Sequence, residues 1–211
     1  MSGSIILLGD SIFDNAIYVP GEPCVTEQLR ELVPGDVEVQ MLPVDGNFVV
    51  DVSTQLEKLP EQATHLFVSV GGNDALSHYA SIKNDFRSSE ELPTKWTEVK
   101  SDFRGQYRAM LERVTSMNRQ TAVCTIYDAV PMIESFAITA LSFFNDVIIS
   151  EAADRGLPII DLRKVCPDNA DYSVLSPIEP SCEGGVKIAS ALMRVFREHD
   201  FTNSVTTIYN H

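Results

Sequence analysis

The sequence is poor in positive charge. Its 211 residues include 16 Lys and Arg against 30 Asp and Glu, so the formal net charge is −14. Nucleic acids and anionic membranes are bound through basic surfaces, and neither is therefore expected as a partner of this chain. The acidic residues are scattered along the sequence and form no tail, which indicates that they keep the surface soluble.

Cysteine is scarce as well. Cys24, Cys124, Cys166 and Cys182 lack the close spacing of metal-binding motifs. Cys124 lies in an apolar run that predicts a core strand, so we interpret the four residues as mostly free thiols, which persist in a reducing compartment. The sequence therefore predicts no metal, no other cofactor and a cytoplasmic location.

No long hydrophobic run opens the chain. The first apolar segment, Ile5–Leu8, is short and has no basic region before it. The sequence therefore predicts neither a signal peptide nor insertion into a membrane. A glycine-rich phosphate loop is also absent after this segment, which disfavours a flavodoxin-like nucleotide-binding protein.

What the chain does contain is an alternation of short β-rich runs with helical patterns. The predicted strands are residues 4–8, 37–42, 65–70, 122–126 and 158–161. The predicted helices are residues 26–32, 51–59, 97–117, 135–155 and 184–197. Residues 77–93 are polar and predict an irregular loop, and residues 201–211 are expected either to add a strand or to fray.

This alternation predicts an α/β fold with a parallel sheet covered by helices on both faces. We expect one domain over residues 1–200, built as a three-layer α/β/α sandwich with five parallel strands in the order 2-1-3-4-5, and a tail over residues 201–211. Right-handed crossovers bring the carboxyl ends of the strands to one edge. Open α/β sheets place their chemistry at that edge.

The first predicted strand ends at Gly9-Asp10-Ser11. Gly9 permits a tight turn, which would place Ser11 at the first turn of a helix, beside unpaired backbone N–H groups. A hydroxyl held there can attack a carbonyl while the N–H groups stabilise the oxyanion. On these residues alone, an N-cap role for Ser11, with Asp14 completing a capping box, is the simpler interpretation.

Two more strands end in polar turns at the same edge, Asp45-Gly46-Asn47 and Gly71-Gly72-Asn73-Asp74. With Gly9-Asp10-Ser11, these segments resemble the SGNH (GDSL) hydrolase superfamily, whose blocks are Gly-Asp-Ser, a lone Gly, Gly-x-Asn-Asp and a late Asp-x-x-His. The resemblance implies a flavodoxin-like serine esterase with Ser11 as nucleophile. The Ser11 and Gly46 backbone N–H groups and the Asn73 side-chain amide would form its oxyanion hole. Asp10 and Asp74 are expected to bond to nearby loop backbone.

The fourth block departs from the family pattern, because Glu179 stands at the histidine position and Ser176 at the aspartate position. In one interpretation Glu179 takes the Ser11 proton directly. Glutamate is a weaker base than histidine by about two pKa units, but desolvation raises its pKa. In the other, Glu179 is only an acidic residue placed before a helix, whose dipole would lower its pKa, and the site is impaired.

Among the histidines, His78 is the alternative base, because it follows Asn73 on the same edge. As a helical residue it would point roughly 140° away from Asn73. His65 begins a strand at the opposite end of the sheet, and His199 and His211 lie in polar surroundings near the carboxyl terminus.

The sequence thus predicts a serine esterase that cleaves a small acyl or acetyl ester through an acyl-enzyme on Ser11. A non-catalytic module that holds an ester, a sugar or an anion in the same cleft is the alternative. The segment 77–96 is long enough to overhang the cleft and to influence the choice of substrate, although Trp96 is as well explained by a place in the core. Nothing in the sequence indicates an oligomeric state.

Overall fold

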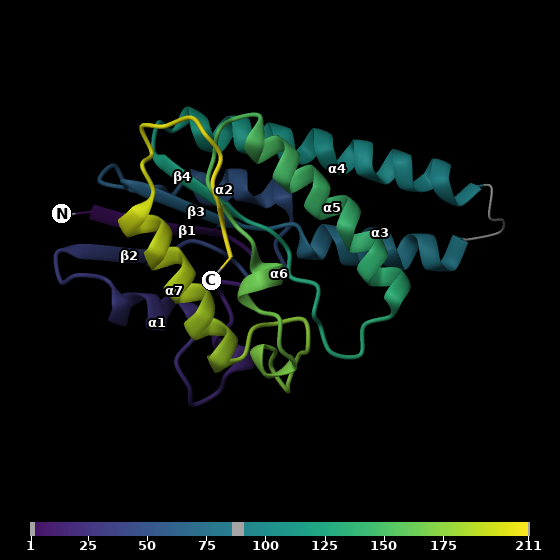
Figure 1. Cartoon of the computed structure of the whole chain (residues 1–211), viewed down its shortest axis with the longest axis horizontal. Helices are drawn as coiled ribbons and strands as arrows, with labels where there is room; N and C mark the ends of the chain where they lie inside the picture. The colour runs from purple at the N-terminus through teal and green to yellow at the C-terminus, as the bar shows by residue number, and fades with distance from the viewer. Residues whose placement is uncertain (1–2, 86–90, 211) are drawn as a thin grey trace.

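A parallel β-sheet of six strands forms the centre of the protein (Figure 1). The structure is a computed structural model that describes the backbone of residues 3–85 and 91–210 and the side chains of residues 3–79 and 93–210. The strand order is β2-β1-β3-β4-β5-β6. The strands are β1 (Gly3–Gly9), β2 (Val37–Met41), β3 (His65–Ser69), β4 (Gln120–Cys124), β5 (Ile159–Ile160) and β6 (Ile208–Tyr209).

The predicted α/β sandwich is confirmed, and the predicted number of strands is one too low. The tail supplies β6, which pairs in parallel with β5. Ile159 N donates to Thr207 O at 2.9 Å and Asp161 N donates to Tyr209 O at 2.8 Å. The tail therefore satisfies backbone groups that would otherwise be left unpaired at the edge of a two-residue strand.

Helices cover both faces of the sheet (Figure 1). Helices α1 and α7 pack against each other on one face, and α4 packs against α2 and α5 on the other. The α-helices are α1 (Val25–Leu32), α2 (Val52–Leu56), α3 (Gly72–Asp85), α4 (Glu91–Ser116), α5 (Ser135–Ala153), α6 (Leu162–Val165) and α7 (Cys182–Glu198). Among the described residues there are also three short 3-10 helices, η1 (Ala16–Tyr18), η2 (Val49–Asp51) and η3 (Asn169–Asp171).

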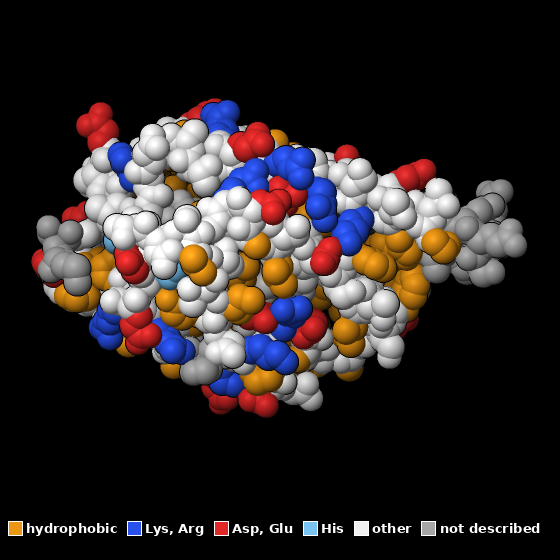
Figure 2. Space-filling view, turned by 45° about the horizontal axis from the view of Figure 1, so that its top comes forward, with side chains coloured by type: hydrophobic (Ala, Val, Ile, Leu, Met, Phe, Trp, Pro, Cys, Tyr) orange, Lys and Arg blue, Asp and Glu red, His pale blue; other side chains and the backbone are white. Residues whose placement is uncertain are grey.

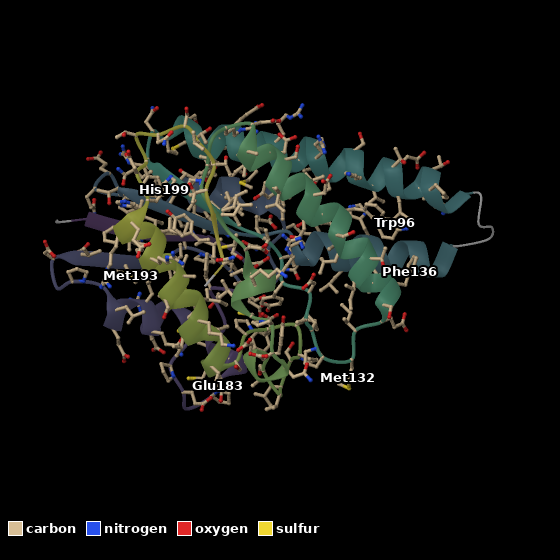
Figure 3. The ribbon with its side chains drawn as sticks, viewed as in Figure 1. Trp96, Met132, Phe136, Glu183, Met193 and His199 are labelled. Atoms are coloured by element: carbon tan, nitrogen blue, oxygen red, sulfur yellow. The ribbon has the colours of Figure 1, made fainter. Side chains whose placement is uncertain are left out.

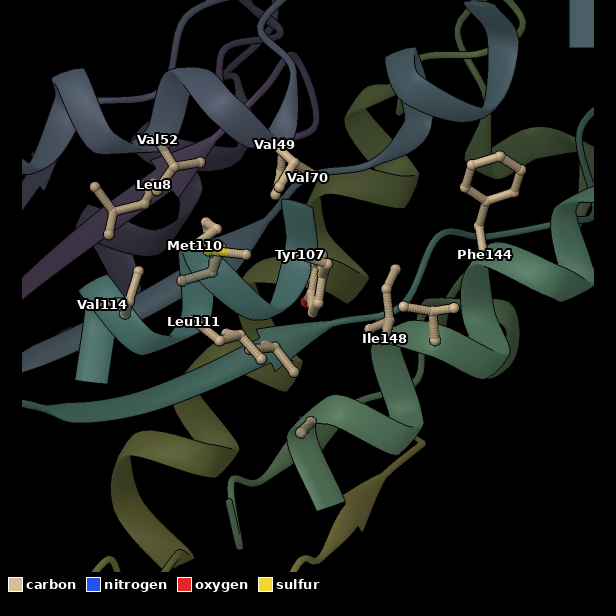
Figure 4. Close-up of a cluster of buried hydrophobic side chains, with 14 of the residues drawn as sticks. Leu8, Val49, Val52, Val70, Tyr107, Met110, Leu111, Val114, Phe144 and Ile148 are labelled. Carbon is tan, nitrogen blue, oxygen red and sulfur yellow. The ribbon is translucent and has the colours of Figure 1, made fainter. Parts of the chain in front are cut away.

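Strand β1 is buried on both faces. Ile6 and Leu8 face the layer of α2, α4 and α5, a part of which Figure 4 shows around Leu8, and Ile5 and Leu7 face α1 and α7. All four side chains are fully buried. Burying each one removes apolar surface worth about 1.5–3 kcal/mol from water, which fixes the end of β1 as a rigid support for the turn that follows.

The sequence predicts an irregular loop over residues 77–93, but the described part of this segment is helical. Helix α3 continues to Asp85 and α4 begins at Glu91, while residues 86–90 of the predicted loop lie outside the described residues. Trp96 is buried, and its ring centroid lies 6.1 Å from that of Phe136 and 5.5 Å from that of Phe143. Trp96 is therefore a core residue that packs against these two rings. Polar composition misled the prediction because one face of each helix is solvated.

The segment after β1 is also different from the prediction. Residues 10–14 form a single turn, in which Phe13 N and Asp14 N both donate to Asp10 O, and no α-helix continues from it. The Asp14 carboxylate accepts a hydrogen bond from Asp45 N at 3.0 Å. The predicted capping box between Ser11 and Asp14 is therefore wrong, and Ser11 does not start a helix.

Helix α5 is the most apolar of the long helices that the structure describes. Within the described part of the chain it is the one helix long and apolar enough to cross a membrane, with a mean hydropathy of 1.4, judged by length and composition only. Of that window, 44% is buried inside the protein, where α5 packs against α4. Core helices of globular proteins meet the same two criteria.

Candidate active site

Ser11 lies at the carboxyl edge of the sheet, in the turn after β1. The turn is tight because Gly9 has a φ of +128°, and a Cβ there would lie 1.8 Å from the carbonyl oxygen of Ser69 on β3. Only glycine fits such an approach. The Ser11 side chain is 6% exposed and lines a cavity at this edge.

The Ser11 hydroxyl donates a hydrogen bond to Glu179 Oε1 at 3.0 Å. The two residues are 168 positions apart in the sequence, so the fold alone brings them together. No histidine lines the cavity among the residues described. His78 is half-buried on α3 with its ring 6.0 Å from that of Phe144, and the His65 ring packs on Phe196 at the opposite edge of the sheet.

Backbone hydrogen bonds hold the loop that carries Glu179. Glu179 N donates to Ser176 O at 2.9 Å and Ser173 N donates to Glu179 O at 2.8 Å. From outside the loop, the Tyr127 hydroxyl donates to Ile178 O at 2.7 Å and the Asn15 amide to Pro180 O at 3.1 Å. The carboxylate is thus positioned without a second acidic residue.

The charge of Glu179 is poorly compensated. The side chain is 4% exposed, and its Oε2 has no hydrogen-bond partner within the described structure. Burial, opposed by the hydrogen bond from Ser11 and helped by the charge of Asp45, raises the pKa of Glu179 to about 7. The lowering of this pKa by a helix dipole, which one reading of the sequence predicts, is therefore outweighed.

Asp10 is a second buried carboxyl at this edge. Ile12 N donates to its Oδ1 at 3.2 Å, so it bonds to loop backbone as expected. Burial, reinforced by the charges of Glu179 and Asp74, raises the pKa of Asp10 to about 8. At neutral pH Asp10 is then mostly a neutral acid, which keeps a second full negative charge away from Ser11.

Asn73 lies in the first turn of α3 and also lines the cavity. Its Nδ2 donates to Asn47 O at 2.9 Å, which ties α3 to the loop after β2 and leaves the second N–H of the amide for another acceptor. Asp74 accepts a hydrogen bond from Val49 N at 3.1 Å and thus bonds to loop backbone, as predicted.

Gly46 lies in that same loop, with a φ of +81° and open space where a Cβ would stand. A residue the sequence analysis missed, Gln55, fixes the loop to the turn after β1. Its side chain donates to Gly9 O at 2.7 Å and to Asn47 Oδ1 at 2.9 Å, and it accepts from Gly9 N at 2.8 Å. Gln55 is fully internal on α2, and no local pattern in the sequence marks it.

The residues that the sequence predicts for the site lie at this edge of the sheet. In the described structure, the N–H groups of Ser11 and Gly46 have no acceptor of their own and remain available to a ligand. The site brings together Ser11, Glu179 and Asn73 at one cavity, and the contact from Asn73 to Asn47 connects the Gly46 loop to it. Among the residues described, no three His, Cys, Asp or Glu side chains converge as a metal site requires.

Solved structures share this architecture. A lipase, Lip_vut3, from a goat rumen metagenome is 19% identical, with a TM-score of 0.69 over 90% of this chain and 96% of its own. The acetyl xylan esterase AlAXEase is 20% identical, with a TM-score of 0.66 over 91% and 98%. Phospholipase A1 from Streptomyces albidoflavus NA297 is 15% identical, with a TM-score of 0.62 over 90% and 98%. At these identities the likeness shows the fold alone.

Comparison of the sequence with curated proteins finds no match. The model of the GDSL-like lipase/acylhydrolase family matches residues 7–180, a span that runs from β1 to the loop of Glu179 and contains Ser11, Gly46 and Asn73. Because this match covers most of the sequence, the chain belongs to the GDSL-like lipase/acylhydrolase family.

Proposed function

We propose that the protein is a serine esterase in which Glu179 acts as the general base for Ser11. One observation carries the proposal, the 3.0 Å hydrogen bond from the Ser11 hydroxyl to Glu179 Oε1. This distance is within the reach that proton transfer to a base requires. The raised pKa supports the role, since a base works best when its pKa lies near the operating pH.

The reaction then proceeds in two halves. Ionised Glu179 takes the proton of Ser11 as Oγ attacks the ester carbonyl, and the oxyanion is held by the N–H groups of Ser11 and Gly46 and by the Asn73 amide. Glu179 returns the proton to the leaving alcohol oxygen as the C–O bond breaks. In the second half Glu179 takes a proton from water as the water oxygen attacks the carbonyl carbon of the acyl-serine. The bond from that carbon to Ser11 Oγ then breaks, Glu179 returns the proton to Oγ, and the acid leaves.

A carboxylate needs less support in this role than a histidine. Imidazole must be held in one tautomer so that the nitrogen facing the serine can accept a proton, and the third residue of a triad performs this task. A carboxylate has no tautomer to fix. A glutamate base therefore needs no aspartate at position 176, where this chain has Ser176. The Ser176 carbonyl oxygen instead accepts the hydrogen bond from Glu179 N in the turn that holds Glu179.

The second candidate, a binding module without turnover, is favoured by the acidity of the site. No cationic side chain lines the cavity within the described structure, and an oxyanion forming near Glu179 and Asp10 is repelled once both are ionised. The two candidates are separated by turnover of p-nitrophenyl butyrate. The esterase releases nitrophenol at a rate proportional to enzyme, whereas the binding module holds the ester and releases nothing above the buffer rate.

The pH dependence follows from the direction of the pKa shift. Only ionised Glu179 accepts a proton, so kcat/KM is expected to rise between about pH 6 and 8 and to reach half of its plateau near the pKa of about 7. A pH series with p-nitrophenyl butyrate, corrected for the buffer rate, measures it. Asp10→Asn is the matched control, because a neutral amide imitates protonated Asp10. If the rise vanishes in Asp10→Asn, Asp10 is the titrating group and Glu179 is not.

Removal of the side-chain oxyanion donor gives a further prediction. Asn73→Ala is expected to lower kcat by about a hundred- to a thousand-fold while KM changes little, because the bond to the oxyanion forms only in the transition state. Steady-state kinetics on p-nitrophenyl butyrate measure this effect. Ser77→Ala, an exposed position one turn further along α3, serves as control. An unchanged kcat in Asn73→Ala would exclude the role.

A further inference from the structure

The cavity beside Ser11 is almost entirely apolar beyond the reacting groups. It runs between α3, α5 and the loop that joins β4 to α5, and it holds about 140 Å³ of space for the centre of a water molecule. Its apolar walls include Val70, Leu76, Ile126, Ile133, Leu141 and Phe144. An apolar cavity of about 150 Å³ in another protein stays dry and binds benzene, so this space suits a chain of at least six carbons.

The length of the cavity along α3 also suits a carbon chain of this size. Asn73, beside the reacting carbonyl, and Tyr79 both line the cavity. The two residues are six positions apart on the helix, which corresponds to about 9 Å along its axis. An extended carbon chain advances about 1.25 Å per carbon, given a bond of about 1.5 Å and an angle near 111°. About seven carbons therefore span the distance from the carbonyl to Tyr79.

Tyr79 is held firmly in its place. Its hydroxyl donates to Glu134 Oε2 at 2.6 Å, which joins α3 to the residue before α5. Its ring lies 6.0 Å from that of Phe136, which packs in turn on Trp96. Trp96 and Phe136 lie together at the outer end of the helical layer (Figure 3). Of the described α3 residues that line the cavity, Tyr79 is the furthest from Asn73.

The surroundings continue the apolar character outward. Phe136 and Ile138 on α5 and Leu76 on α3 are partly exposed, and Met132 in the preceding loop is 94% exposed. Met132 also adopts a left-handed φ of +61°, which is unfavourable for a side chain of this kind. Figure 2 shows hydrophobic side chains gathered at the end of the molecule where α4 and α5 begin. The loop of Gly46 presents a polar pair outside the apolar lining, the Tyr18 hydroxyl bonded to Asp45 at 2.8 Å, and the charge of Asp45 acts on Glu179.

We propose that this cavity binds the acyl group of the substrate, that it selects unbranched acyl chains of medium length, and that Tyr79 forms its end wall. The inference rests on the proposed esterase function. It revises the small acyl or acetyl group that the sequence suggests, because an acetyl group leaves most of the cavity empty. The polar side of the site, with Asp45 and Tyr18, then receives the alcohol, which faces Glu179 and accepts its proton.

The test uses p-nitrophenyl acetate, butyrate, octanoate and laurate, with kcat/KM measured for each at concentrations below micelle formation. Burial of one methylene is worth about fourfold in binding, so wild-type protein is expected to favour octanoate over acetate by at least about tenfold and to lose rate on laurate. Octyl acetate, which places the long chain on the alcohol, is expected to gain no such advantage over ethyl acetate.

Variants of Tyr79 test the end wall. Tyr79→Ala is expected to move the optimum from octanoate to laurate, and Tyr79→Trp to move it towards butyrate. Tyr79→Phe keeps the ring and is expected to keep the octanoate optimum. Ser142→Ala, an exposed position on α5 outside the cavity, is the matched control. Thermal melts followed by circular dichroism verify that each variant is folded.

The result that overturns the inference is Ser11-dependent turnover whose chain-length profile is flat, or is unmoved by both Tyr79→Ala and Tyr79→Trp. The inference is also overturned if kcat/KM is higher for octyl acetate than for ethyl acetate while p-nitrophenyl octanoate shows no advantage over the acetate, since the cavity would then bind the alcohol. If no ester is turned over, the proposed function fails, and the cavity is tested separately in Ser11→Ala. There, calorimetry is expected to show octanamide binding at least about tenfold more tightly than acetamide, and equal affinities would contradict the acyl site.

Discussion

Ser11→Ala is expected to lower kcat/KM on p-nitrophenyl octanoate by at least about ten-thousand-fold, to the level left by binding and the oxyanion donors alone. The alanine removes the atom that forms the acyl-enzyme, and no other hydroxyl in the described structure bonds Glu179. The fold is expected to survive with a somewhat lower melting temperature, because the buried Glu179 carboxylate loses the hydrogen bond that it accepts from Ser11. A cooperative thermal melt followed by circular dichroism verifies that the variant is folded.

Ser53→Ala is the matched control for this loss. The Ser53 hydroxyl donates to Val50 O at 2.8 Å, on a surface away from the cavity. We expect Ser53→Ala to keep full activity, while Ser11→Ala keeps only the small residual turnover given above. If Ser11→Ala kept wild-type turnover, the esterase mechanism on Ser11 would be wrong.

Glu179→Gln is expected to lower kcat by about a hundred- to ten-thousand-fold, the usual contribution of a general base. The amide keeps the size of the side chain and accepts the hydrogen bond from Ser11, but it cannot take a proton from it. KM is expected to change little, because binding of a neutral ester does not use the charge of Glu179. The variant is also expected to melt no lower than wild type, since it removes a buried and poorly compensated carboxylate.

Glu183→Gln is the control for loss of a nearby carboxylate. Glu183 is exposed in the first turn of α7, close in sequence to Glu179 but outside the cavity, and Figure 3 shows it at the end of that helix. Its variant is expected to keep wild-type kinetics. A similar loss of kcat in both variants would mean that the change in overall charge explains the effect and that proton transfer by Glu179 does not.

Much of the fold is predictable because the strands have strong local signals. The run Ile5–Leu8 is buried on both faces, and such runs mark central parallel strands in the sequence. The sequence does not decide whether the tail forms a strand, because β6 (Ile208–Tyr209) is only two residues long and is stabilised by its pairing with β5. The end of α3 and the start of α4 are harder to predict, because the many polar residues of segment 77–93 are typical of a loop as well as of the solvated face of a helix.

The site is predictable where a backbone requirement leaves a mark in the sequence. Gly9 and Gly46 have left-handed φ values, and Asn73 lies in the first turn of a helix at the edge of the sheet. The contacts that hold these residues are invisible to sequence patterns, as Gln55 shows by bonding both Gly9 and Asn47. The raised pKa of Glu179 is likewise a product of burial, which only the assembled fold provides.

The most direct test of the account is the rate at which a fluorophosphonate labels Ser11, followed by mass spectrometry across a pH series in wild type and in Glu179→Gln. Labelling reports the reactivity of the serine itself and needs no knowledge of the natural ester. The account predicts that wild-type labelling rises with pH to half of its maximum near pH 7, and that Glu179→Gln labels at least about a hundred-fold more slowly with no rise there. Equal labelling rates with the same pH dependence in both proteins would contradict the claim that Glu179 activates Ser11.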